Sequence, residues 1–170
     1  MKRVLVIGSG GAGKSTFARR LGERLGLPVI HLDRAYWHPG WVETPKDEWR
    51  RKVEEMCAGE TWVMDGNYSG TLEVRLAACD SVIFLDLPRV LCVWRVLRRS
   101  FMYGERGRSD MAEGCRERPD LEYVKFIAWV WNYRKRSRPK VLALLESAAS
   151  DKRVVRLRSS EEVERFLAEV

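Results

Sequence analysis

The chain has 170 residues, of which 45% are hydrophobic and 32% charged, a composition typical of one globular domain. Its net charge of +7 indicates an anionic partner, either nucleotide phosphates or nucleic acid. No apolar stretch approaches the roughly 20 residues that cross a bilayer, so we expect a cytoplasmic protein with no membrane partner.

A glycine-rich segment follows the first expected strand. Residues 8–15 fit the pattern G-x-x-x-x-G-K-[ST] of a phosphate-binding P-loop. Its backbone N–H groups and the start of the next helix can bind phosphate oxygens. Lys14 can bridge the β- and γ-phosphates, and the Ser15 hydroxyl can bind Mg²⁺. The predicted triphosphate site comprises Gly8, Ser9, Gly10, Gly11, Ala12, Gly13, Lys14, Ser15 and Thr16.

Strand and helix signals alternate along the whole chain, with residues 34–44 as an irregular aromatic segment and 102–118 as a mobile polar loop that can act as a lid. In chain order we expect strand 2–8, helix 14–25, strand 29–32, helix 45–58, strand 61–64, helix 70–78, strand 81–87, helix 88–101, helix 120–137, helix 139–148, strand 154–157 and a final helix capped by Ser160. This alternation predicts an α/β fold with a parallel sheet and helices on both faces. Without repeats or linkers, residues 1–170 are expected to form a single domain.

Acidic residues follow several expected strands, at the sheet edge where ligands bind. Asp65 follows an apolar run, as does the Walker B acid that holds Mg²⁺ through water. Asp86 fits the same pattern, and the pattern alone does not choose between them; capping of the next helix is the alternative for both. Asp33 can orient a substrate hydroxyl or take its proton, and a turn-forming aspartate is the alternative. The two histidines, His31 and His38, are expected in core or surface roles.

Arginines form the second informative set. Arg95 and Arg99 share a face of helix 88–101, and Arg106 lies in the expected lid. Such arginines can neutralise charge during phosphoryl transfer, with a solvated basic face as the alternative. A further basic cluster has no motif and is expected to be solvated: Arg134, Lys135, Arg136, Arg138 and Lys140. On helix 120–137 we expect an apolar core stripe: Leu121, Val124, Ile127, Ala128 and Trp131.

These features together resemble the adenylate-kinase-like small kinases, which carry an Asp-Gly pair like Asp65-Gly66 and an Arg-x-x-x-Arg helix like Arg95 and Arg99. A closer resemblance is to bacterial proteins labelled DNA topology modulation protein. Its pieces are His31-Leu32-Asp33, Pro39-Gly40-Trp41, Asp65-Gly66-Asn67-Tyr68, Arg95-Val96-Leu97-Arg98-Arg99, Gly114-Cys115 and Ser137-Arg138-Pro139.

The resemblance implies a five-stranded parallel sheet of order 2-3-1-4-5, a closing lid, and ATP with Mg²⁺ as the phosphoryl donor. It also implies that Arg95 flanks the adenine and that Arg99 contacts phosphates. The chain departs from adenylate kinases at Asn67 and Tyr68. Its segment 34–60, expected on the acceptor side, lacks the usual arginine and offers Asp33 with aromatic residues, more like the shikimate and gluconate kinases.

We therefore expect an ATP-dependent phosphotransferase that acts on a small hydroxylated or nucleoside-like acceptor. Lys14, Asp33, Arg99 and Arg106 are the expected catalytic residues, and Ser15 and Asp65 the expected magnesium-binding residues. Two alternatives stay open: a nucleotide-dependent regulatory protein that binds nucleic acid through its basic surface, and a plain nucleoside triphosphatase. The acceptor and the oligomeric state do not follow from the sequence.

Overall fold

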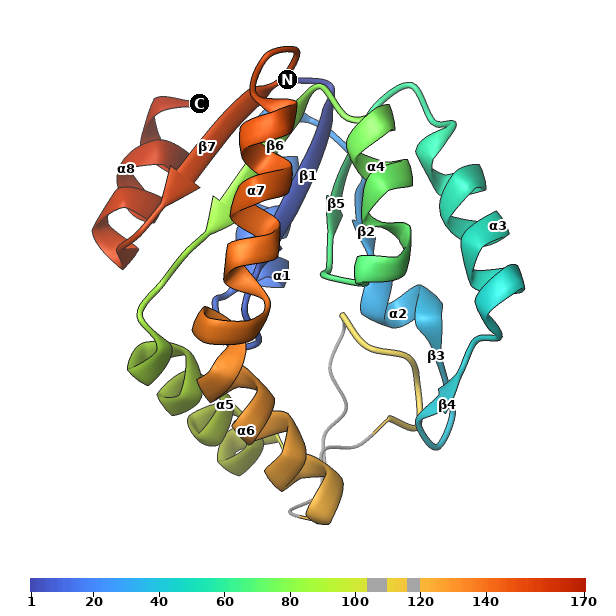
Figure 1. The fold of residues 1–170 in the computed structure, drawn as a ribbon, viewed down its shortest axis with the longest axis vertical. Coiled ribbons are helices and arrows are strands. Elements are labelled where there is room, and N and C mark those ends of the chain that lie inside the picture. The colour runs from blue at the N-terminus through green and yellow to red at the C-terminus, as the bar shows by residue number, and fades with distance from the viewer. Residues whose placement is uncertain (104–109, 116–119) are drawn as a thin grey trace.

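A five-stranded parallel sheet forms the centre of the molecule (Figure 1). The computed structural model describes residues 1–103, 110–115 and 120–170, so Arg106 and most of the expected lid lie outside the described residues. The strands are β1 (Arg3–Gly8), β2 (Val29–His31), β5 (Trp62–Asp65), β6 (Ser81–Leu85) and β7 (Arg153–Leu157). Their spatial order is β2-β5-β1-β6-β7. Counted along the chain, this is the expected order 2-3-1-4-5.

Helices cover both faces of the sheet because successive residues of β1 point in opposite directions. Val4 and Val6 pack with α1 (Lys14–Leu25) and α8 (Ser160–Glu169), whereas Leu5 and Ile7 pack with α3 (Lys46–Cys57) and α4 (Leu72–Ala78). The remaining long helices are α5 (Arg89–Tyr103), α6 (Leu121–Arg136) and α7 (Arg138–Ala148). The expected α/β class is therefore confirmed. None of the helices in the described ranges is long and apolar enough to cross a membrane.

Residues 34–44 are more regular than expected. They contain the end of α2 (Leu32–Tyr36) and a hairpin of β3 (Trp37–His38) and β4 (Val42–Glu43). Thr44 closes this unit, because both its N–H and its hydroxyl donate to the carbonyl of Tyr36. The N-cap position of α3 is taken by the next residue, Pro45. Likewise Ser159, and not Ser160, caps α8 by accepting a hydrogen bond from Glu162 N.

The apolar stripe expected on α6 is wrong in most of its members. Leu121 and Val124 are exposed, whereas Val130 and Tyr133 are buried. The buried face is set by what α6 covers, because it packs against α5 and directly against the glycine-rich loop. A Cβ atom at Gly10 would lie only 2.8 Å from Val130 Cγ2. Helical periodicity in the sequence does not reveal such a neighbour.

Candidate functional site: a glycine-rich loop with two carboxylates

The glycine-rich loop joins β1 to α1 at the carboxyl edge of the sheet. Gly11 and Gly13 have φ values of 74° and 90°, in the region that favours glycine. A Cβ atom at Gly11 would lie 2.2 Å from the carbonyl oxygen of Cys92, so no larger residue fits there. The loop ends at Lys14, Ser15 and Thr16 in the first turn of α1, whose N-terminus attracts anions. These residues fit a triphosphate cradle.

Lys14 extends back over the loop, where its Nζ donates to the carbonyl oxygen of Ser9 at 3.0 Å. Burial lowers the pKa of Lys14, the charges of Asp33 and Asp65 oppose this shift, and Arg99 adds to it. Asp33, Asp65 and Arg99 therefore lie within electrostatic range of the Lys14 ammonium group. The structure thus brings together four residues that the sequence placed on separate elements.

Asp65 ends β5 and is almost fully buried, with 4% of its surface exposed. Its Oδ1 lies 2.6 Å from Nδ1 of His31, the residue opposite it in the β2–β5 register. This hydrogen bond to Asp65 raises the pKa of His31. His31 thus belongs to the site, which the sequence analysis missed. The expected strand order could have revealed His31, because His31 and Asp65 are the last residues of two strands that are neighbours in that order.

Asp33 lies in α2, directly after β2, and its Oδ1 accepts a hydrogen bond of 2.7 Å from the hydroxyl of Tyr68. Tyr68 also packs against Tyr36 and Trp49, with ring centroids 4.6 and 5.0 Å away. Trp49 is buried, whereas Tyr36 and Tyr68 keep part of their surface exposed. The aromatic residues of this region therefore serve both as core and as a wall beside Asp33.

The turn at residues 65–68 is held by a buried arginine that no motif pointed to. Arg75 has no exposed surface and donates to the carbonyl oxygens of Gly66, Asn67 and Tyr68 at 2.7 to 2.9 Å. Burial lowers the pKa of Arg75 to about 10, so the guanidinium stays protonated near neutral pH. Asn67 Oδ1 in turn accepts from the N–H of Gly8 at 3.2 Å. The Asn67 side chain thereby links this turn, which Arg75 holds, to the glycine-rich loop.

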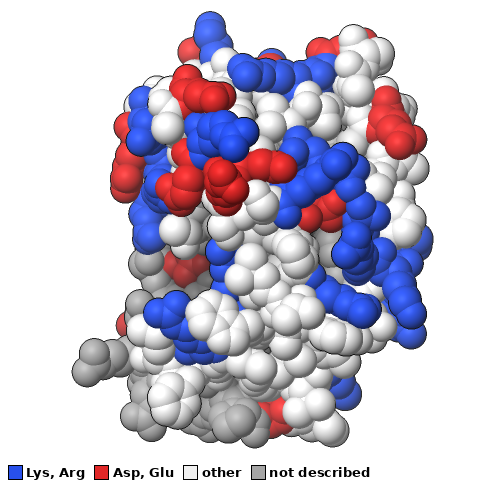
Figure 2. All heavy atoms as spheres, turned by 90° about the vertical axis from the view of Figure 1, so that its left-hand side faces the viewer, with Lys and Arg blue, Asp and Glu red and all other residues white. Residues whose placement is uncertain are grey.

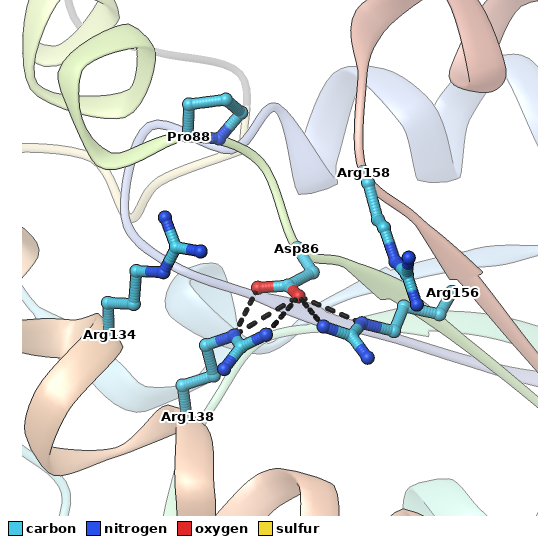
Figure 3. Close-up of a pocket in the computed structure, with 6 residues that line it drawn as sticks. All are labelled: Asp86, Pro88, Arg134, Arg138, Arg156 and Arg158. Atoms are coloured by element: carbon cyan, nitrogen blue, oxygen red, sulfur yellow. Dashed lines mark hydrogen bonds and ion pairs between the residues drawn. The ribbon is translucent and has the colours of Figure 1, made fainter.

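The other candidate residues take different places. The carboxylate of Asp86 forms ion pairs with Arg138 and Arg156 (Figure 3). Arg95 donates to the carbonyl oxygen of Ala12 at 3.3 Å and to Ser160 Oγ at 3.0 Å, and so lies against the phosphate loop. Arg106 lies outside the described residues.

No group of three or more histidine, cysteine or acidic side chains that could hold a metal occurs in the described ranges. Mg²⁺ at phosphoryl-transfer sites is commonly bound by one or two protein oxygens together with substrate phosphates and water. The hydroxyl of Ser15 and the carboxylate of Asp65 fit that mode of binding.

Comparison with known proteins supports the fold. Neither a family model nor a curated protein matches the chain. Among the solved structures that match the chain are an unliganded sugar kinase from Janibacter sp. HTCC2649 and a gluconokinase from Sinorhizobium meliloti 1021, each of which covers 99% of it. The sugar kinase is 18% identical, with a TM-score of 0.50, and 93% of its chain is covered. The gluconokinase is 16% identical, with a TM-score of 0.51, and 92% of its chain is covered. The chain therefore shares the α/β fold of these two kinases.

Proposed function

We propose that the protein is an ATP-dependent phosphotransferase that moves the γ-phosphoryl group of ATP to a hydroxyl of a small acceptor. The observation that carries this proposal is the surroundings of Lys14, which lies within electrostatic range of two carboxylates at the carboxyl edge of the sheet. One of them, Asp65, is buried beside the phosphate loop, and the other, Asp33, lies beside an aromatic wall. This arrangement provides one carboxylate for each half of a transfer reaction.

On the donor side, the backbone of residues 8–13 would surround the phosphates, and Lys14 would neutralise their charge. Ser15 and Asp65 would hold Mg²⁺, which offsets the negative charge that develops on the phosphoryl oxygens. Asp65 is the better candidate than Asp86, because the Asp86 carboxylate already accepts hydrogen bonds from two guanidinium groups. Arg95 would flank the nucleoside, from its contacts with the loop and with α8.

On the acceptor side, Asp33 would orient the attacking hydroxyl and accept its proton. Tyr68 would fix the orientation of that carboxylate through its hydrogen bond. Arg99, whose charge reaches Lys14, would stabilise the transferring group together with Arg106 of the lid. Aromatic faces beside a carboxylate suit a compact hydroxylated molecule, such as a sugar, a sugar acid or a nucleoside.

The proposal is tested by measuring ADP release from ATP with a panel of sugars, sugar acids and nucleosides. We expect one class to raise the rate, Lys14→Ala to abolish that increase, and Asp33→Asn to reduce it while ATP still binds. Asp47→Asn, on the exposed side of α3, is the matched control and should behave as the unmodified protein. Retained transfer in Lys14→Ala, or hydrolysis that no acceptor redirects, would show that the proposal is wrong.

A further inference from the structure

A second basic site lies behind the phosphate loop. A cavity of about 280 Å³ is lined by Asp86, Pro88, Arg134, Arg138, Arg156 and Arg158 (Figure 3). Asp86 follows β6, Arg134 and Arg138 come from α6 and α7, and the last two belong to β7 and the residue after it. Four guanidinium groups and one carboxylate give this cavity a net formal charge of +3. None of the residues proposed above for phosphoryl transfer lines it.

The ion pairs around Asp86 leave positive charge unbalanced. Arg138 and Arg156 both donate to Asp86 Oδ2 through Nε and Nη2, at distances between 2.6 and 3.1 Å. One carboxylate can neutralise only one of these two guanidinium groups, and all three side chains are at most 29% exposed. Arg134 and Arg158 add two further guanidinium groups at the wall of the same cavity. Such an excess of partly buried positive charge favours an anion.

Two buried hydroxyl groups nearby have no hydrogen-bond partner in the described part of the chain. They are Ser9 Oγ and Tyr133 OH, and both residues line a small adjoining space together with Asp86, Arg134 and Arg138. Ser9 and Tyr133 are only 6% and 5% exposed. Burial raises the pKa of Tyr133, so its hydroxyl remains a donor. An unpaired buried polar group costs about 1–3 kcal/mol, so both hydroxyls have reason to bind a ligand oxygen.

The cavity lies close to the phosphate loop, and its arginines come from the α7 face of the sheet. Leu85, which precedes Asp86, pairs with Gly8 in the sheet, and the small adjoining space, rather than the cavity itself, reaches the phosphate loop at Ser9. Along β7, Val155 packs into the core under α1, whereas Val154 packs into the core under α7. Arg156 lies two residues after Val154 and so has its side chain on the same face of the sheet. Arg156 therefore points to the α7 face of the sheet, opposite the face that α1 covers.

We propose that this arginine pocket binds the phosphate group of a small phosphorylated molecule, as an anion site separate from the phosphate loop. Guanidinium groups match the oxygens of a phosphate through paired hydrogen bonds. A dianionic phosphate balances the charge of +3 better than a carboxylate does. On the neighbouring face, Lys and Arg side chains also gather toward one edge (Figure 2). The basic cluster on α6 and α7, expected from the sequence to be solvated, thus contributes Arg134 and Arg138 to a cavity.

The test is calorimetric titration of the full chain carrying Lys14→Ala, which weakens the phosphate loop and leaves the arginine pocket intact. The probes are inorganic phosphate and glucose 6-phosphate, which distinguish a free anion from a phosphorylated metabolite. We expect saturable binding that Arg134→Gln with Arg158→Gln weakens about tenfold or more, because two charge-assisted contacts are lost. Both arginines are exposed, so the fold should persist, and thermal unfolding checks this.

Arg136→Gln is the matched control, since Arg136 is an exposed arginine of the same helix that does not line the cavity. It should bind both probes as its parent does. Absence of saturable binding, or equal affinity in the double variant and its parent, would overturn the proposal. Neither result depends on phosphoryl transfer, so failure here is distinguishable from failure of the proposed function.

Discussion

The hydroxyl of Tyr68 donates a hydrogen bond of 2.7 Å to the carboxylate of Asp33, from a turn 35 residues further along the chain. Asp33 follows β2 and Tyr68 follows β5, and these two strands are neighbours in the sheet. Burial and the charge of Asp33 raise the pKa of Tyr68, so the hydroxyl remains protonated and continues to donate. The Tyr68 phenol therefore helps to hold the Asp33 side chain in its orientation.

Tyr68→Phe tests this dependence. We expect the variant to fold and bind ATP normally, but to transfer phosphate to the acceptor about tenfold more slowly, as expected for the loss of one hydrogen bond to a charged group. Steady-state kinetics with acceptor and ATP varied separately measure the effect. Tyr123→Phe removes a hydroxyl that bonds Val96 O and serves as the control. An unchanged kcat in Tyr68→Phe would contradict the role of this hydrogen bond.

Arg75→Leu should destabilise the protein strongly. The substitution leaves the carbonyl oxygens of Gly66, Asn67 and Tyr68 without their buried donor. We expect the free energy of unfolding to fall by about 3 kcal/mol or more. Urea denaturation monitored by tryptophan fluorescence gives the value. Arg50→Leu, at an exposed position of α3 with one intrahelical ion pair, should change it by less than about 1 kcal/mol; similar losses in both variants would refute the assignment.

Gly11→Ala should abolish ATP binding. A Cβ atom there would overlap the carbonyl oxygen of Cys92, so the loop must change its path. Gly26→Ala is the matched control, because Gly26 also has a positive φ, 65°, but has open space around it. We expect the control to lose only about 1 kcal/mol of stability and to keep its nucleotide affinity. Titration with a fluorescent ATP analogue compares the nucleotide affinities of the two variants. Unchanged affinity in Gly11→Ala would contradict the prediction, because the loop would then bind ATP despite the added Cβ atom.

Asp80→Asn should reduce stability in a pH-dependent manner. Burial raises the pKa of Asp80, but hydrogen bonds from Ser81 and from the N–H groups of Arg3 and Lys2 outweigh this effect and lower it. Because the pKa is lowered in the folded protein, the stabilisation is present above the ordinary aspartate pKa and is lost as the pH falls through the lowered one. Urea denaturation should show a deficit in the variant at pH 7 that shrinks below about pH 4. A deficit that is constant with pH would exclude an electrostatic origin.

Much of the fold follows from local signals in the sequence. Apolar runs identify the strands, and the P-loop pattern locates the first turn of α1 at Lys14. What the sequence does not reveal depends on contacts between distant residues. The hairpin at 37–43 is closed by Thr44, which bonds back to Tyr36. The buried face of α6 is determined by the glycine loop beneath it.

The candidate site shows the same division. The order of the strands is enough to bring Asp33 and Asp65 to one edge of the sheet. The pairing of Asp65 with His31 requires the register of β2 against β5. The Asp86 carboxylate accepts hydrogen bonds from Arg138 and Arg156, which lie 52 and 70 residues further along the chain. No local sequence pattern contains that information.

The close approach of α6 to Gly10 restricts how this sequence can change. Phe126 and Val130 occupy the space that a side chain at position 10 would need, at 2.9 and 2.8 Å from its Cβ. An alanine at position 10 would force the side chains of both Phe126 and Val130 to move, and Val130→Ala would relieve only one of these two contacts. In an alignment of homologues, position 10 should therefore covary with positions 126 and 130, with a larger residue at position 10 accompanied by smaller residues at the other two.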